Sequence, residues 1–279
     1  MAESGSPWGR GNRRERDRTG RAGKRPVTDA GAPDAPGTAR ELRLYGLNAV
    51  RAMFARRPDA LRKLYLAESR IPDLQPLLKW CAAHRVGYRV VDEDDLRRLA
   101  ASGHHEGVVA DVLRPPALAL TDWLASLAPG PHLAIWLDGV GNPHNYGAIL
   151  RSAAHFGASA ILLPRHSTLA LSGAASRVAE GGAEAVPEVR MGRPENAVAQ
   201  LRGGGFQLAA TVVAGGSSVF DAVLPERLVL VMGAEGSGMD RDFAQACDLQ
   251  LSVPGTGAVE SLNVAAATAV MLAAWRMRH

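Results

Sequence analysis

Cysteine is scarce in this sequence, and long apolar runs are absent. The 279 residues include two cysteines, Cys81 and Cys247, which stand far apart and form neither a disulfide framework nor the spacing of a zinc site. The most apolar stretch, residues 264–275, is shorter than the roughly 18–20 residues of a membrane-spanning helix. The basic N-terminus has no apolar signal core behind it. These absences predict a cytoplasmic protein without a membrane segment.

The formal net charge is +4, and all of it lies in the first 40 residues. Residues 1–40 contain nine Lys or Arg and five Asp or Glu, whereas the other 23 basic and 23 acidic residues cancel. This segment is rich in Gly, Pro and Arg and nearly without apolar side chains, so it cannot bury enough surface to fold. We interpret it as a disordered basic tail. Its role is either RNA contact through phosphates or solubility alone.

Residues 41–113 alternate between helical and strand patterns, which is typical of a small α/β domain. Leu47, Val50 and Phe54 recur at helical spacing before Pro58, and this predicts the first helix. The expected strands after it are 61–69, 86–91 and 106–113, and the expected helices are 71–84 and 92–102. The next segment, 114–131, contains four prolines and predicts a linker with one short helix.

From residue 132 to residue 279 the alternation resumes and predicts a doubly wound α/β domain. Several expected strands are continuous apolar runs, as in parallel strands that are covered on both faces. The strand candidates are 132–140, 158–164, 206–213, 227–233 and 249–254, and the helix candidates are 146–156, 171–183, 194–202, 240–246 and 261–278. Ligands bind such sheets beyond the carboxyl ends of the strands.

Three loops that follow expected strands carry polar side chains. In the first, "NPHNYGAILRS", Asn145 suits a helix N-cap, and Arg151 is either a phosphate ligand or an ordinary surface arginine. In the third, "VPGTGAVESLNVAAATAV", Ser261 is either a cap of the following helix or a functional group, and Asn263 stands beside it. Each loop alone is a weak signal, but all three are expected at one edge of the sheet.

The second loop, "LVLVMGAEGSGM", lets a strand run straight into several glycines. Glu235 in this loop suits either a helix-capping carboxylate or a functional acid. The glycine spacing is G-x-x-G-x-G, whereas a dinucleotide loop has G-x-G-x-x-G. The spacing therefore argues against a nicotinamide-dependent oxidoreductase.

In their order and context the three loops resemble the motifs of the SpoU (TrmH-type) RNA ribose 2′-O-methyltransferases, a branch of the SPOUT class. The stretch "SRVAEGGAEAVPEVR" between them fits the same family, and "LYGLNAVRAMF" to "HHEGVVADV" resembles its small substrate-binding domain. The resemblance covers residues 41–279. It implies an S-adenosyl-L-methionine cofactor, methyl transfer to a ribose 2′-hydroxyl of rRNA or tRNA, and a homodimer. It also implies that the C-terminal part of the sheet is threaded into a deep trefoil knot.

The resemblance further assigns roles to residues. It implies that the catalytic residues are Asn145, Arg151, Glu235, Ser261 and Asn263, and that the cofactor is held, chiefly through backbone groups, by Gly233, Val253 and Leu262. No metal is implied. The alternative function is a catalytically weak or inactive RNA-binding paralogue of the same fold.

Two questions stay open at this point. A guanidinium is a poor base because its pKa lies above about 12, so Arg151 either accepts the hydroxyl proton or holds a phosphate beside the target ribose.

In the turn of His104, His105 and Glu106, an exposed conformation is expected. Glu106 stands where members of the family often have Gln, which would place an acid near the RNA.

Overall fold

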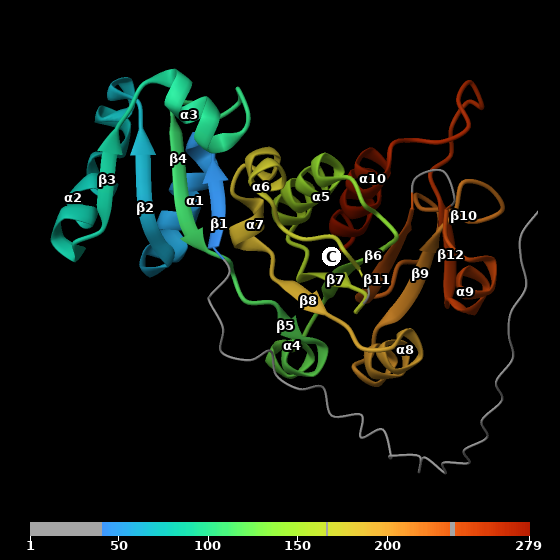
Figure 1. The fold of residues 1–279 in the computed structure, drawn as a ribbon. Helices are drawn as coiled ribbons and strands as arrows, with labels where there is room; N and C mark the ends of the chain where they lie inside the picture. Colours follow the sequence, from blue (N-terminus) through green and yellow to red (C-terminus); the bar gives the residue numbers. More distant parts are fainter. Residues whose placement is uncertain (1–40, 166, 235–237) are drawn as a thin grey trace, which may run out of the picture. The chain divides into compact units, whose positions relative to one another are not determined.

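The chain forms two β-sheets with helices packed against them, as the computed structural model in Figure 1 shows. The structure describes residues 41–165, 167–234 and 238–279. The predictions for the basic tail at residues 1–40 and for Glu235 lie outside these described residues.

The smaller sheet has the strand order β1-β4-β2-β3. β4 runs antiparallel to β1 and β2, and β3 runs parallel to β2. Leu64 and Leu66 pack in one core with residues of α1 and α2, whereas Val109 packs with Leu96 of α3 on the other face. The bounds are β1 (Glu41–Tyr45), α1 (Leu47–Arg56), β2 (Leu61–Leu66), α2 (Gln75–His84), β3 (Gly87–Val90), α3 (Glu93–Ala100) and β4 (Val108–Leu113).

The helices and strands predicted for this region are confirmed, and β1 is an additional strand. In β1, Leu42 and Leu44 are buried while Glu41 and Arg43 are exposed, which is the alternation of a strand with one covered face. The strand is only five residues long and runs almost directly into α1. The helical spacing that follows it therefore dominated the sequence signal.

The larger sheet has the order β10-β12-β9-β11-β6-β7-β8-β5, and its neighbouring strands are all parallel. This confirms the doubly wound α/β architecture, while the knot remains a prediction. The strands are β5 (Leu118–Ala119), β6 (His132–Asp138), β7 (Ala160–Leu163), β8 (Glu188–Arg190), β9 (Gln207–Thr211), β10 (Ser217–Ser218), β11 (Arg227–Gly233) and β12 (Leu249–Ser252).

Helices cover this sheet on both faces (Figure 1). They are α4 (Leu120–Ser126), α5 (Pro143–Phe156), α6 (Gly173–Ala179), α7 (Gly182–Ala185), α8 (Pro194–Gly203), α9 (Arg241–Ala246) and α10 (Val264–Arg276). Alternate residues of the strands enter two separate apolar cores, so that Ile135 of β6 lies in one core and Trp136 in the other. Within the described residues, no helix has the length and apolar character that crossing a membrane requires.

The predicted linker contributes to the larger sheet. Its short helix is α4, as predicted, and Trp123 of this helix is buried with its ring 5.5 Å from that of Phe206. Ahead of α4, Leu118 and Ala119 form the edge strand β5, which pairs with β8. The segment is therefore packed onto the sheet over part of its length.

The turn before β4 was expected to be exposed, and for His105 this is wrong. His105 is only 3% exposed, and its Nδ1 accepts a hydrogen bond from the Gly107 amide at 3.2 Å. Glu106 adopts a positive φ of 54°. Its carboxylate accepts from the Leu47 amide at the start of α1 at 2.9 Å and forms an ion pair with Arg177 of α6. Glu106 therefore binds groups within the protein.

Helices α5 and α6 approach each other closely at Gly147. A Cβ atom on Gly147 would contact the backbone carbonyl of Ala175 and would lie 2.8 Å from the Cβ of Val178. Because a backbone atom cannot move aside as a flexible side chain can, only glycine fits at this position. The glycine thus serves the packing of two helices.

We expect Gly147→Ala to lower the free energy of unfolding by about 1–3 kcal/mol, since overpacking would force the two helices apart. Urea denaturation followed by circular dichroism measures this change. Gly203→Ala is the matched control, because Gly203 is also helical and has nothing within 4 Å of an added Cβ. The control should be neutral or slightly stabilising, and equal destabilisation of both variants would contradict the packing argument.

Candidate functional site

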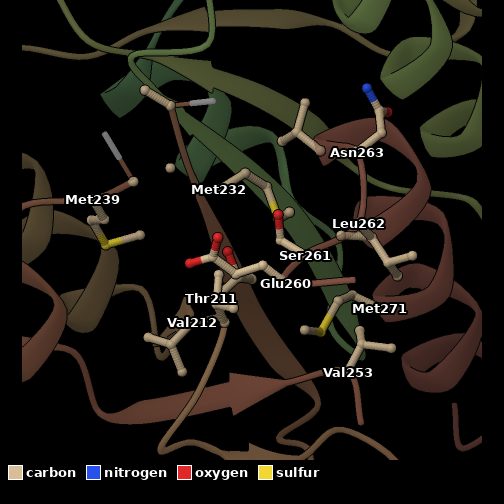
Figure 2. A pocket seen from close by; sticks show the side chains of 16 residues that line it. Thr211, Val212, Met232, Met239, Val253, Glu260, Ser261, Leu262, Asn263 and Met271 are labelled. Atoms are coloured by element: carbon tan, nitrogen blue, oxygen red, sulfur yellow. The ribbon is translucent and has the colours of Figure 1, made fainter. Parts of the chain in front are cut away.

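A pocket lies at the carboxyl ends of three neighbouring strands, β9, β11 and β12 (Figure 2). Its volume is about 480 Å³, within the range of small-molecule sites. Each strand ends here and continues into a loop. The residues that precede α10 form the opposite wall of the pocket. The lining residues are Thr211, Val212, Val213, Met232, Gly233, Ala234, Gly238, Met239, Val253, Glu260, Ser261, Leu262, Asn263, Val264, Ala267 and Met271.

The structure places all three residues predicted to hold the cofactor in the wall of this pocket. Gly233 is the last residue of β11, Val253 directly follows β12, and Leu262 lies just before α10. Ser261 and Asn263, which were predicted to be catalytic, line the same pocket. Residues from the second and third loops are thus brought together, as expected for loops at one edge of a parallel sheet.

Gly233 has a local structural reason to be glycine. A Cβ atom here would lie 2.8 Å from the carbonyl carbon of Gly238 and 2.8 Å from the amide nitrogen of Met239. The loop returns to this point because Ala234 and Gly238 exchange two backbone hydrogen bonds, at 3.1 and 3.0 Å. The returning backbone therefore forms part of the pocket wall.

Asn263 has two functions in the structure. Its Oδ1 accepts from the amides of Ala265 at 2.9 Å and Ala266 at 3.3 Å, which makes it the N-cap of α10. Its Nδ2 donates to Oδ1 of Asn145 at 3.1 Å. Asn263 thereby connects the loop before α10 with α5. The expectation that Ser261 caps this helix is wrong, since the cap is two residues later.

Asn145 lies inside α5, in its first turn. The N-cap of α5 is Asn142, whose side chain accepts from the His144 amide at 2.8 Å. The interpretation of Asn145 as a plain N-cap is therefore wrong. Both asparagines suit a cap by residue type, and Pro143 at the first helical position is what fixes the earlier start.

Farther along α5, the Tyr146 hydroxyl donates to Glu188 of β8 at 3.0 Å. Burial raises the pKa of Tyr146 well above its usual range, and the neighbouring Glu188 carboxylate raises it further. The hydroxyl stays protonated and holds α5 to β8. This bond and the Asn145–Asn263 bond fix both the orientation and the position of the helix start.

Arg151 is exposed and does not belong to the pocket wall. It follows Asn145 by six residues, which at about 100° per residue places the two side chains roughly 120° apart around α5. Among the described catalytic candidates, the structure brings together Asn145, Ser261 and Asn263 but leaves Arg151 on another side of the helix. Its side chain is available to a large ligand that extends beyond the pocket.

The pocket wall combines apolar side chains with a few polar groups. Met232, Met239 and Met271 supply flexible apolar surface (Figure 2). Thr211 Oγ1 donates to the carbonyl of Val231 at 2.9 Å, so its hydroxyl hydrogen is already used. Glu260 adds a carboxylate to the wall, a place in the pocket that the sequence did not predict. Its position next to Ser261 in "ESLN" was the available signal.

Among the described residues, no group of three or more His, Cys, Asp or Glu side chains is placed to hold a metal ion. The two cysteines are free. Burial raises the pKa of Cys247 to about 11, so this thiol is protonated near neutral pH.

Comparison with known proteins gives a consistent picture. Residues 132–273 match the model of the SpoU rRNA methylase family, and residues 43–117 match that of the RNA 2′-O ribose methyltransferase substrate-binding domain. The chain is 35% identical to YfiF of Escherichia coli O157:H7, an uncharacterized tRNA/rRNA methyltransferase, over 85% of this chain and 68% of that protein. It is 34% identical to the 23S rRNA (guanosine-2′-O-)-methyltransferase RlmB of Pseudomonas syringae, over 82% of this chain and 93% of RlmB.

A solved structure agrees with these sequence relatives. The AdoMet-bound rRNA methyltransferase of Sinorhizobium meliloti has a TM-score of 0.71 at 25% identity, and the match covers 86% of this chain and 88% of that one. The SpoU methyltransferase AviRb of Streptomyces viridochromogenes, at 23% identity and a TM-score of 0.70 over 85% of this chain and 90% of AviRb, has the same fold. The chain thus belongs to the SpoU family of RNA ribose 2′-O-methyltransferases.

Proposed function

We propose that this protein transfers the methyl group of S-adenosyl-L-methionine to a ribose 2′-hydroxyl of ribosomal RNA. Its family membership supports the reaction type, and the relatives named as 23S rRNA methyltransferases support ribosomal RNA as the substrate. The observation that carries the proposal is the shared pocket. It unites Gly233, Val253 and Leu262, predicted to hold the cofactor, with Ser261 and Asn263.

The residues present fit the cofactor. Gly233 and Val253 contribute to the pocket wall, and Leu262 presents an apolar side chain that is 48% exposed. Together with the three methionines they suit a flat adenine ring, while Ser261 and Glu260 suit hydroxyl and cationic groups. When bound, S-adenosyl-L-methionine supplies a methyl group on a sulfonium that is already activated for transfer. Gly233, Val253 and Leu262 would hold it.

We assign Arg151 to the RNA. An exposed guanidinium on α5 suits a phosphate beside the target ribose, because its planar donors bind phosphate oxygens in pairs. Holding the phosphate would orient the 2′-hydroxyl toward the pocket, and such positioning contributes much of the catalysis in reactions between two bound groups. Asn145, bonded to Asn263, would set the position of α5, and Glu235 is assigned with them from the family resemblance.

A homodimer is also part of the proposal. On α10, the apolar residues Ala266, Ala269, Val270 and Ala273 are exposed or half-buried, and their spacing of three, four and seven places them on one side of the helix. Small side chains allow another backbone to come close. A second copy of this chain packed on this side would lie near the residues that line the pocket.

We further propose that three segments of the chain have different roles. Residues 41–113 would present RNA, residues 114–131 would connect the two parts, and residues 132–279 would transfer the methyl group.

Incubation of the full chain with ribosomal RNA and radiolabelled S-adenosyl-L-methionine tests the activity. Mapping ribose methylation in RNA from a deletion strain and its parent would identify the nucleotide. Cofactor binding by calorimetry without methyl transfer to RNA would instead favour the inactive paralogue.

Leu262→Asp should weaken S-adenosyl-L-methionine binding by at least tenfold. The substitution places a charge on an apolar part of the pocket wall, and because Leu262 is 48% exposed the fold should keep its stability. Isothermal titration calorimetry measures the affinity, and thermal denaturation measures the stability. Val259→Asp is the control, since Val259 is 71% exposed and outside the pocket wall. Unchanged affinity in Leu262→Asp would contradict the cofactor assignment.

Arg151→Ala should lower methyl transfer to RNA by about 10²–10⁴-fold, the range typical of a lost catalytic or orienting group. Cofactor affinity should stay unchanged, because Arg151 does not line the pocket. Radiolabel incorporation and calorimetry measure the two quantities. Arg151→Lys distinguishes the two roles considered for Arg151, which are accepting the hydroxyl proton and holding a phosphate. A lysine keeps the positive charge but not the paired phosphate contact. Wild-type rates for Arg151→Ala would show that the assignment is wrong.

Asn263→Ala should cost about 1 kcal/mol of stability through the lost helix cap, and it should also reduce methyl transfer. Asn263→Asp retains the capping oxygen but cannot donate to Asn145, so it should be close to wild type in stability and still impaired in transfer. Chemical denaturation and radiolabel incorporation distinguish these effects. If Asn263→Asp has full activity, the bond to Asn145 has no part in the reaction.

A further inference from the structure

The short helix α7 lies between α1, which packs on the smaller sheet, and α5 (Figure 1). Two successive glycines bring it close to both helices. A Cβ atom on Gly181 would lie 2.7 Å from the Cβ of Ala52 on α1. A Cβ atom on Gly182 would lie 2.6 Å from the carbonyl oxygen of Leu150 and 3.1 Å from the Cα of Arg151. The start of α7 therefore packs directly against the backbone of Arg151.

Arg57 holds the other end of α7. It directly follows α1, and its Nε and Nη2 donate to the two carboxylate oxygens of Glu184 in α7, each at 2.7 Å. Its Nη1 donates to the carbonyl of Leu113, the last residue of β4, at 3.0 Å. Paired contacts between a guanidinium and a carboxylate are strong and fix the orientation of both groups. Arg57 thus joins α1, β4 and α7.

The Arg57–Glu184 pair is shielded from water. The side chain of Glu184 is 6% exposed and that of Arg57 is 24% exposed. A carboxylate this deeply buried requires its partner, because an unpaired buried charge is strongly destabilising. The turn before α7 is also bonded to α1, since Asn48 Nδ2 donates to Glu180 at 2.6 Å. The position of α7 is therefore set by the helix that packs on the smaller sheet.

We propose that the Arg57–Glu184 pair positions Arg151 for methyl transfer, with α7 as the connection. α7 has four residues, fewer than a helix needs to be stable by itself, so its place depends on the groups that contact it. A shift of α7 would remove the surface against which the Arg151 backbone packs. Neither Arg57 nor Glu184 lines the pocket, so both are positioning residues. The inference rests on the proposed function, where Arg151 is assigned to the RNA.

The test uses the full chain with Arg57→Gln, Glu184→Gln and the double variant. The rate of a single turnover, at saturating S-adenosyl-L-methionine and ribosomal RNA, reports positioning separately from binding. Hydrogen exchange of the α5 amides, followed by mass spectrometry, reports whether the helix is held. Calorimetry measures cofactor affinity, and thermal denaturation measures folding.

Arg202→Gln is the matched control. Arg202 of α8 likewise donates to a carboxylate, that of Asp248, and to a carbonyl, that of Ala246, both at 2.9 Å. α8 packs in the core on the other face of the larger sheet from α5. The control therefore removes a comparable set of contacts at a distance from Arg151.

Arg57→Gln should lower the single-turnover rate by roughly 10–100-fold, the size of effect that a small misplacement of a reacting group produces. Cofactor affinity should be unchanged, and the α5 amides should exchange faster. The double variant should be no slower than Arg57→Gln, because residues that act as a pair have non-additive effects. Arg57→Lys keeps the charge and one contact with Glu184, and should recover part of the rate.

A wild-type rate in folded Arg57→Gln, or an equal loss in Arg202→Gln, would overturn the inference. Additive losses in the double variant would do the same, since they would show that the two residues act independently. If Arg57→Gln does not fold, Glu184→Gln and Arg57→Lys give the same comparison with a milder change.

Failure of the proposed function has a different signature. If the wild-type chain transfers no methyl group, faster α5 exchange in Arg57→Gln but not in Arg202→Gln would still show that the pair holds α5. Unchanged α5 exchange in Arg57→Gln would overturn the inference whatever the activity of the wild-type chain.

Discussion

The hydrogen bond from Asn263 to Asn145 joins two segments 118 residues apart, and the arrangement of the site depends on it. The same Asn263 side chain ends the loop after β12 by capping α10. α10 then packs against α5 and β11. One amide side chain therefore fixes where the last helix begins, how it meets the first motif and which residues face the pocket. Because both amide atoms of Asn263 are used, replacing it with a residue of similar size cannot preserve all three constraints.

The two parts of the chain use β-structure in different ways. In the larger sheet, apolar cores cover both faces, so polar chemistry is confined to the loops at the strand ends. This places a pocket for a small molecule among those loops. In the smaller sheet, apolar cores cover much of β1, β2 and β4, whereas the edge strand β3 is exposed along its whole length. A surface of this kind suits a polymer that is too large to enter a pocket. The architecture thus matches a reaction between a small methyl donor and a large acceptor.

Much of the fold was predictable because buried parallel strands appear as apolar runs, and β6, β7, β9 and β11 have this form. The strands β5, β8 and β10 were not predicted, since two or three residues are too few to show a period. The site residues Gly233, Val253 and Leu262 were found through their motifs. The ion pair of Glu106 with Arg177 and the reason for Gly147 arise from tertiary contacts, which spacing along the chain does not reveal. Arg151 is exposed and outside the pocket wall, so its assignment to the RNA is a proposal.

The strand order also matters for the growing chain on the ribosome. β6 pairs with β7 on one side and with β11 on the other, yet β11 is synthesised long after β6. Until it emerges, β6 has an open, strongly apolar edge, the kind of edge through which unfinished chains aggregate. That edge is covered only when β11 pairs with β6. The cofactor pocket cannot form before the residues after β12 leave the exit tunnel, so methyl-donor binding is a property of the finished chain alone.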